Sequence, residues 1–94
     1  MHLMDQDTVL VRTRAFLQDA FLYMRPGLAL GDSDRLLDKG IIDSMGILEL
    51  IGFLQSEFGV GVRDDDINED NLGTVADIAR YVMSRQAGNG NGDS

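Results

Sequence analysis

The hydrophobic residues in the first quarter of the chain recur at the spacing of an amphipathic helix. They lie at Val9, Leu10, Phe16, Leu17, Ala20, Phe21 and Met24. Asp7 or Thr8 is placed to cap the start of this helix with a side-chain oxygen. Pro26-Gly27 predicts its end, because proline disfavours helix at the preceding residue and glycine permits the turn.

A long connection follows over residues 28–43. It is punctuated by Gly31 and Gly40, but it also contains Leu28, Leu30, Leu36, Leu37, Ile41 and Ile42. A structureless loop of this length is unusual in a small domain, so we expect these side chains to pin the connection across the helices. The segment is therefore predicted to be an ordered, packed loop.

The second helix is predicted to start at Asp43 or Ser44, either of which can cap it, and to run to Phe58, with Gly59 ending it. Its core stripe lies at i, i+3, i+4, i+7 and i+11. The residues of this stripe are Ile47, Leu50, Ile51, Leu54 and Phe58. A second apolar set, Met45 and Leu48 with Gly52 one turn further on, lies to one side and cannot all be buried by the same neighbours.

Two shorter signals complete the pattern. Residues 64–67, three aspartates and Ile67, predict a short helical turn with acids at its favourable N-terminal end. Thr74 followed by Asp77 resembles a capping box for a last helix. The buried face of that helix is predicted to consist of Val75, Ile78, Ala79 and Val82.

The predicted fold is all-α: a small bundle of three main helices plus one short helix, with a long ordered loop between helices one and two. Residues 1–87 are expected to form the domain. Residues 88–94, Gly-Asn-Gly-Asn-Gly-Asp-Ser, have nothing to bury and predict a flexible polar tail. The start at Met1 and this short tail favour a stand-alone protein rather than a module of a larger one.

Composition and charge narrow the classes of function. Ninety-four residues suffice for one domain, and 44% hydrophobic with 26% charged residues is globular usage. The net charge of −8 argues against nucleic-acid binding, which needs lysine and arginine. The excess lies in residues 32–70, with eleven acids against Arg35, Lys39 and Arg63. That segment would steer a basic partner, or it would serve equally as a solubilising surface.

The chain has no cysteine and a single histidine, His2. Neither a thiol nucleophile, a Ser-His pair nor a histidine metal site can be assembled, so we expect no catalytic residues and no metal site. No apolar run reaches the roughly 20 residues of a membrane span, and no secretion signal is present at the start. The sequence therefore predicts a soluble, cytoplasmic protein that is not an enzyme.

Ser44 stands at the predicted start of the second helix, after Gly40, the pair Ile41-Ile42, and Asp43. A helix N-terminus favours an anionic group because its free N–H groups and its dipole point outward. A phosphodiester carried on Ser44 would suit this position. An isolated Asp-Ser pair, however, is in most proteins only a helix cap.

The wider pattern is more specific, because residues 36–82 resemble the phosphopantetheine-dependent carrier proteins, the acyl and peptidyl carrier family. The resemblance covers about half of the chain at consistent spacing. It rests on Leu37, Asp38, Gly40, Ile41-Ile42, Asp43-Ser44-Met45, Glu49-Leu50, Leu54, Glu57-Phe58-Gly59, an acidic stretch, Asn71-Leu72, Thr74-Val75, Ile78 and Val82.

The resemblance implies roles for individual residues. Ser44 looks like the hydroxyl that a phosphopantetheinyl transferase esterifies from coenzyme A, and Asp43 like the acid that helps the transferase and its metal ion, as well as capping the helix. Met45 and Leu48 match exposed apolar contacts for partner enzymes, with Glu49 as a charged contact. For Leu48 and Glu49 an ordinary surface position is the alternative.

Ile67 is a further partner-contact candidate that fits the core equally well. The missing cysteine then has an explanation, since the thiol would come with the 4′-phosphopantetheine arm and cargo would ride on it as a thioester.

The residues around Ser44 also bear on the cargo. Gly46, which follows Met45, stands where fatty-acid carriers commonly have an acid. Glycine costs about 1 kcal/mol against alanine in a helix. Together with Leu36-Leu37-Asp38 and Phe58-Gly59-Val60, Met45-Gly46 looks closer to D-alanyl and free-standing aminoacyl carriers. We expect a monomer that an adenylating ligase loads with an amino acid for a downstream acyl-transfer enzyme. The alternative is an acyl carrier for fatty-acid or polyketide-type synthesis.

The acidic residues of the chain fit two other classes of function in part. Asp66, Asn68 and Asp70 at alternate positions suggest calcium binding, but an EF-hand loop starting at Asp66 would need glycine and glutamate where Asn71 and Asp77 stand. An acidic adaptor would bind a basic partner through residues 32–70 without any need for Ser44.

Overall fold

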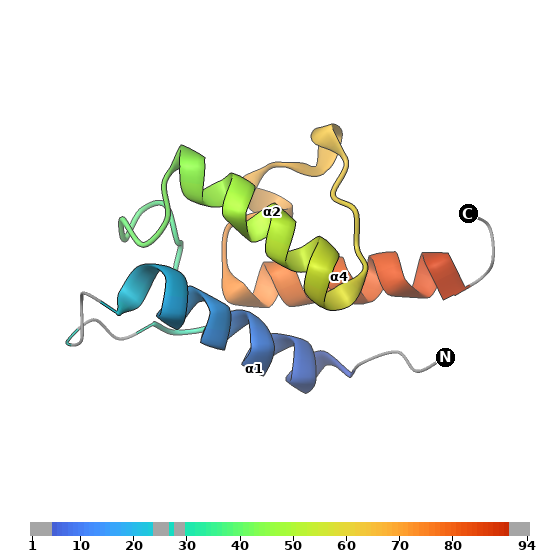
Figure 1. The fold of residues 1–94 in the computed structure, drawn as a ribbon, viewed down its shortest axis with the longest axis horizontal. Coiled ribbons are helices and arrows are strands. Elements are labelled where there is room, and N and C mark those ends of the chain that lie inside the picture. The colour runs from blue at the N-terminus through green and yellow to red at the C-terminus, as the bar shows by residue number, and fades with distance from the viewer. Residues whose placement is uncertain (1–4, 24–26, 28–29, 91–94) are drawn as a thin grey trace.

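The computed structural model describes residues 5–23, 27 and 30–90, with side chains through Gln86. Its elements are α1 (Gln6–Leu17), the π-helical turn η1 (Gln18–Leu22), α2 (Ser44–Phe58), the 3-10 turn η2 (Asp64–Asp66), α3 (Glu69–Leu72) and α4 (Val75–Gly90). The described ranges contain no strand. The predicted all-α class is confirmed (Figure 1).

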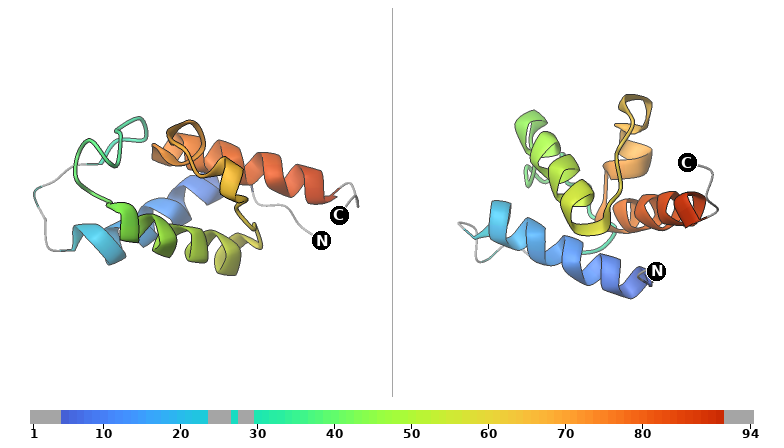
Figure 2. Two further views of the ribbon diagram at one scale, coloured as in Figure 1. Left: turned by 90° about the horizontal axis from the view of Figure 1, so that it is seen from above. Right: turned by 45° about the vertical axis from the view of Figure 1, so that its right-hand side comes forward.

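The three long helices are arranged so that the start of α2 is set apart at one end of the molecule. α1 runs in the opposite direction to α2 and α4, and the start of α1 and the end of α4 lie toward the same end (Figures 1 and 2). The start of α2 lies at the other end, beside the end of the first helix when viewed from above (Figure 2). Ser44, the first residue of α2, therefore lies at the end opposite to the start of α1 and the end of α4.

The first helix starts earlier than predicted. Asp5, rather than Asp7 or Thr8, is the cap, and its Oδ1 accepts a hydrogen bond from the Thr8 N–H at 2.8 Å. Buried positions then follow at Val9, Thr13 and Leu17, and at Leu22, the last residue of the π-helical turn. The α-helix ends at Leu17, and the predicted end at Pro26 lies outside the described residues, as does Met24.

The connection before α2 is packed, as predicted. Leu36, Ile41 and Ile42 are buried, and Leu36 is completely so. Two backbone hydrogen bonds connect the loop to the region where α4 begins. Leu36 N–H donates to Gly73 O, just before α4, at 2.9 Å, and Ala76 N–H in the first turn of α4 donates to Asp32 O at 3.0 Å. Leu37 is different, because 44% of it is exposed, and Leu28 lies outside the described residues.

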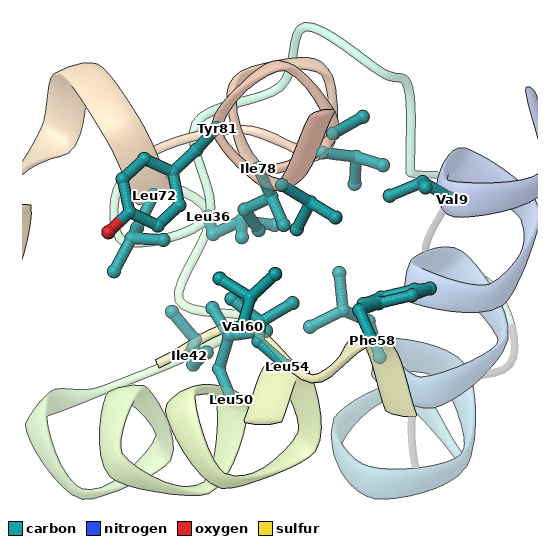
Figure 3. Close-up of a cluster of buried hydrophobic side chains, with 14 of the residues drawn as sticks. Val9, Leu36, Ile42, Leu50, Leu54, Phe58, Val60, Leu72, Ile78 and Tyr81 are labelled. Carbon is teal, nitrogen blue, oxygen red and sulfur yellow. The ribbon is translucent and has the colours of Figure 1, made fainter. Parts of the chain in front are cut away.

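The core is shared by α1, the loop before α2, α2 and α4. Leu50, Leu54 and Phe58 are buried as predicted, whereas Ile47 and Ile51 are half-buried at the edge of the core. All four predicted residues of the α4 face are completely buried: Val75, Ile78, Ala79 and Val82. The labelled side chains of α2 and α4 point toward one another, with Leu36 among them and Val9 entering from α1 (Figure 3).

The four phenylalanines of the chain form one aromatic ladder between the first helix and α2. They are Phe16, Phe21, Phe53 and Phe58. The ring of Phe16 stacks on that of Phe53 with centroids 4.3 Å apart. Phe21 meets Phe16 edge-on at 5.8 Å, and Phe58 meets Phe53 edge-on at 5.5 Å. Offset and edge-on pairs of this kind add to the stability gained by burial. The ladder links the end of the first helix to both halves of α2.

The segment between α2 and α4 differs from the prediction in detail. The predicted turn at 64–67 is a 3-10 turn over Asp64–Asp66, and the four-residue α3 that follows was not predicted. Its cap is Asn68, whose Oδ1 accepts a hydrogen bond from the Asn71 N–H at 2.9 Å. The predicted capping interaction at α4 is present, because Thr74 Oγ1 accepts from the Asp77 N–H at 3.0 Å. α4 continues to Gly90, past the predicted domain end at 87.

Two glycines in α2 have opposite surroundings. A Cβ atom on Gly46 would lie 2.6 Å from Ile42 Cγ1 and 3.0 Å from the Phe21 ring. A Cβ atom on Gly52, which is exposed, would have no atom within 4 Å. The close packing explains why glycine stands in the first turn at position 46 despite its poor helix propensity, and no contact within the described residues requires it at position 52.

We expect Gly46→Ala to lower the free energy of unfolding by about 1–3 kcal/mol, because the added methyl group overpacks the contact. Gly52→Ala should raise it by about 0.5–1 kcal/mol through helix propensity alone. Urea denaturation of both variants measures this difference. Changes of the same sign in the two variants would contradict the packing at Gly46.

Thr13 generates a second stability prediction. It is completely buried, and among the described residues its hydroxyl has no hydrogen-bond partner. Thr13→Val keeps the shape and removes the desolvated hydroxyl, so the free energy of unfolding should rise by about 1 kcal/mol. Chemical denaturation checks the change, and a less stable variant would show that the hydroxyl is satisfied.

Candidate functional site

Ser44 is exposed at the first position of α2, and its neighbour provides the helix cap. Asp43 Oδ1 accepts a hydrogen bond from the Gly46 N–H at 2.8 Å, and Asp43 O accepts from the Ile47 N–H at 3.0 Å. The sequence left the cap open between the two residues, and the structure assigns it to Asp43. Within the described ranges no hydrogen bond engages the Ser44 hydroxyl, so this hydroxyl is free for chemistry.

The start of α2 also favours negative charge. No backbone carbonyl in the described part of the chain accepts from the amides of Ser44 or Met45, which belong to the unpaired first turn of a fifteen-residue helix. The helix dipole adds partial positive charge at the same point. A phosphodiester on the Ser44 hydroxyl would therefore lie beside free N–H donors.

The three residues predicted to contact partners on α2 lie on its exposed face. Met45 is 72% exposed and Leu48 is 65% exposed, which is unusual for large apolar side chains. Glu49 is exposed beside them and takes part in no ion pair among the described residues. α2 itself contains no lysine or arginine, so this face combines apolar and acidic groups.

Ile67 lies apart from the α2 face and outside the buried core. It is 39% exposed and lines a largely apolar cavity of about 140 Å³. The other lining residues are Leu37, Ile47, Asn68, Glu69, Leu72 and Gly73. Ile47 lies three residues after Ser44, which places this cavity close to the start of α2.

Leu37 was not predicted as a site residue. Its exposed side chain forms part of the cavity, although the sequence suggested that it would be buried with Leu36. The apolar pattern of the loop does not separate Leu37 from Leu36, since the adjacent pair Ile41 and Ile42 is buried at both positions.

Ion pairs and hydrogen bonds hold the two sides of the cavity together. Arg35 pairs with Asp38 on its own loop and with Glu69 on α3. Asp66, at the end of η2, accepts two further hydrogen bonds. The Tyr81 hydroxyl of α4 donates to its Oδ2 at 2.8 Å, and Asn71 Nδ2 of α3 donates to its backbone O at 3.0 Å. Burial raises the pKa of the Tyr81 hydroxyl, and the bond to Asp66 raises it further. The hydroxyl therefore stays a proton donor to Asp66 at neutral pH.

These contacts also give a structural role to two of the residues that suggested calcium binding. Asp66 receives the Tyr81 hydroxyl, and Asn68 caps α3. In the part of the chain that the structure describes, no group of three or more His, Cys, Asp or Glu side chains is placed to hold a metal ion. None of the described helices has the length and apolar character needed to cross a membrane.

Asp43→Ala removes the cap and should lower the free energy of unfolding by about 1 kcal/mol, whereas Asp43→Asn keeps an acceptor oxygen and should change it little. Thermal and urea unfolding of the two variants separate these outcomes. Equal losses in both variants would show that the charge, rather than the cap geometry, stabilises the start of α2.

Comparison with known proteins agrees with this geometry. Residues 21–82 match the family model described as "Phosphopantetheine attachment site". The D-alanyl carrier protein of Streptococcus pyogenes serotype M5 (strain Manfredo) is 35% identical over 65 residues, which cover 69% of this chain and 81% of that protein. D-alanyl carrier proteins from serotypes M49 (strain NZ131) and M1 of the same species show the same identity and coverage.

The matched segment runs from the π-helical turn through the loop and α2 into α4, so it contains every element around Ser44. The group attached in this family is 4′-phosphopantetheine, and its members are carriers rather than catalysts. The exposed, unbonded hydroxyl at the start of α2 fits such an attachment. The chain belongs to the phosphopantetheine-dependent carrier proteins.

Proposed function

We propose that Ser44 carries the 4′-phosphopantetheine arm and that the protein holds an aminoacyl group as a thioester on it. One observation carries the assignment of the site: Asp43 caps α2, which leaves the exposed Ser44 hydroxyl without a partner among the described residues. In the attachment step the Oγ–H bond of Ser44 breaks and an Oγ–P bond forms. At the same phosphorus a P–O bond of the coenzyme A pyrophosphate breaks, so that adenosine 3′,5′-bisphosphate leaves, and the enzyme that performs the transfer takes the proton.

Asp43 would then serve two ends at once. Its Oδ1 accepts the Gly46 N–H, while Oδ2 has no hydrogen bond within the described residues and is available to the metal ion of a phosphopantetheinyl transferase. The carboxylate is thus held in one orientation beside the hydroxyl that reacts. The arm, once bound, supplies the thiol that a chain without cysteine lacks.

The size of the cavity favours a small cargo. The cavity near the start of α2 has about 140 Å³, close to one that holds a benzene molecule, so a small cargo suits this cavity better than a long acyl chain. The relatives named D-alanyl carrier proteins also favour an amino acid. An acyl carrier for fatty-acid or polyketide-type synthesis is the second candidate, and it needs partners that accept the neutral Gly46 after Met45.

The remaining assignments concern partners. We assign Met45, Leu48 and Glu49 as contacts for the transferase, an adenylating ligase and a downstream acyl-transfer enzyme, with Ile67 as a further contact beyond the cavity. The acidic middle segment would steer basic faces of these enzymes toward Ser44. A cytoplasmic monomer suits repeated encounters with several enzymes. We keep residues 1–87 as the domain, although α4 extends three residues into the predicted tail.

Intact-protein mass spectrometry after incubation with coenzyme A and a broad-specificity phosphopantetheinyl transferase tests the site. The protein should gain the mass of one phosphopantetheine group, and Ser44→Ala should gain none. Asp43→Asn, which keeps the cap, should react more slowly by about tenfold or more because the metal ion loses a ligand. No mass gain, or a gain that persists in Ser44→Ala, would refute the assignment.

Loading tests the cargo. The modified protein, incubated with ATP, a candidate adenylating ligase and single amino acids, should gain one aminoacyl mass that hydroxylamine removes, as expected for a thioester. Loading by long-chain acyl groups in place of amino acids would favour the second candidate. A basic partner that binds Ser44→Ala and wild type equally, with no modification of either, would favour the acidic adaptor.

A further inference from the structure

The π-helical turn at the end of the first helix changes which residues face the core. Val9, Thr13 and Leu17 are buried at steps of four, and an unbroken α-helix would place Phe21 next on the same stripe. The turn over Gln18–Leu22 inserts one residue, so the next buried position is Leu22. Phe21 is only half-buried and is turned away from the stripe. The insertion therefore moves one aromatic side chain out of the core.

Phe21 instead contacts the first turn of α2. A Cβ atom on Gly46 would lie 3.0 Å from Cε1 and 3.2 Å from Cζ of this ring, so the ring rests against the bare backbone of Gly46. The edge-on contact with Phe16, itself stacked on Phe53, limits the movement of the ring. Since any larger residue at position 46 would clash, the ring and the glycine fit each other.

Gly46 is also the residue whose N–H the Asp43 carboxylate accepts. One side of this backbone segment is thus held by the Phe21 ring and the other by the cap, two residues from Ser44. We propose that Phe21 is a positioning residue for Ser44, and that the π-helical turn holds the start of α2 in place while the hydroxyl reacts. This inference rests on the proposed function of Ser44 as the attachment site.

The expected effect is on the chemical step rather than on binding. Helix ends open more readily than helix centres, and a hydroxyl in an opening turn is seldom in the geometry that the reaction needs. Leu48 and Glu49 lie in the second turn, away from the contact, so these two proposed partner contacts are retained, and only Met45 lies in the turn that opens. Loss of the ring should therefore lower kcat for phosphopantetheine transfer and leave KM nearly unchanged.

Phe21→Leu tests the role, with Phe58→Leu as the matched control at the other end of α2. Phe58 is the more buried of the two, so the control should lose at least as much stability. With coenzyme A and a broad-specificity transferase, Phe21→Leu should lower kcat by about five- to tenfold with KM within about twofold. Phe58→Leu should leave both constants within about twofold. Equal losses of kcat in the two variants, or a change in KM alone, would overturn the positioning role.

Hydrogen exchange gives a readout that needs no enzyme. In Phe21→Leu the amides of Gly46 and Ile47, which bond to Asp43, should exchange about tenfold faster relative to amides in the centre of α4. In Phe58→Leu they should not. Unchanged relative exchange in Phe21→Leu would overturn the inference whatever the kinetics. A wild-type protein that fails to be modified would instead contradict the proposed function, and the exchange comparison would still decide whether the ring holds the turn.

Discussion

The burial of one face of α2 in the shared core is the constraint on which the site depends. Leu50, Leu54 and Phe58 are buried in that core, and the helical repeat then forces Met45, Leu48 and Glu49 to the opposite side. The same core buries Leu36 of the preceding loop, which fixes where α2 starts. An exposed serine, an apolar face and an acid beside it are consequences of which side of one helix is buried.

The start of α2 is held from two directions by different kinds of interaction. The Asp43 carboxylate satisfies the Gly46 N–H, whereas Phe21 and Ile42 pack against the same glycine. Hydrogen bonding and close packing thus act on one residue, and neither involves the Ser44 hydroxyl. A residue that forms part of the fold's own hydrogen-bond network would lose that bond when modified. Here the contacts that hold the start of α2 lie at Asp43 and Gly46 and leave the hydroxyl of the proposed attachment residue, Ser44, outside them.

Local pattern was enough to predict the limits of α2, the buried face of α4 and the exposure of Met45 and Leu48, because each follows from helical periodicity and residue-specific caps. The π-helical turn was not predictable in this way. Leu22 takes the buried position, and the ring of Phe21 packs against Gly46, which is distant in sequence. The exposure of Leu37 likewise depends on contacts across the fold. The Asn68 cap of α3 is local, because Asn68 Oδ1 accepts from the N–H of Asn71, and it was missed.

The loop before α2 is bound to residues that lie far along the chain. Leu36 N–H donates to Gly73 O, Ala76 N–H donates to Asp32 O, and the Arg35 side chain pairs with that of Glu69. None of these contacts exists until the chain has been synthesised beyond residue 76 and has folded back on itself. A peptide that contained only the residues around Ser44 would have the same local sequence but would lack the contacts that hold its loop. The support of the proposed attachment site is thus complete only once the tertiary fold has formed, and an unfinished chain lacks the arrangement described around Ser44.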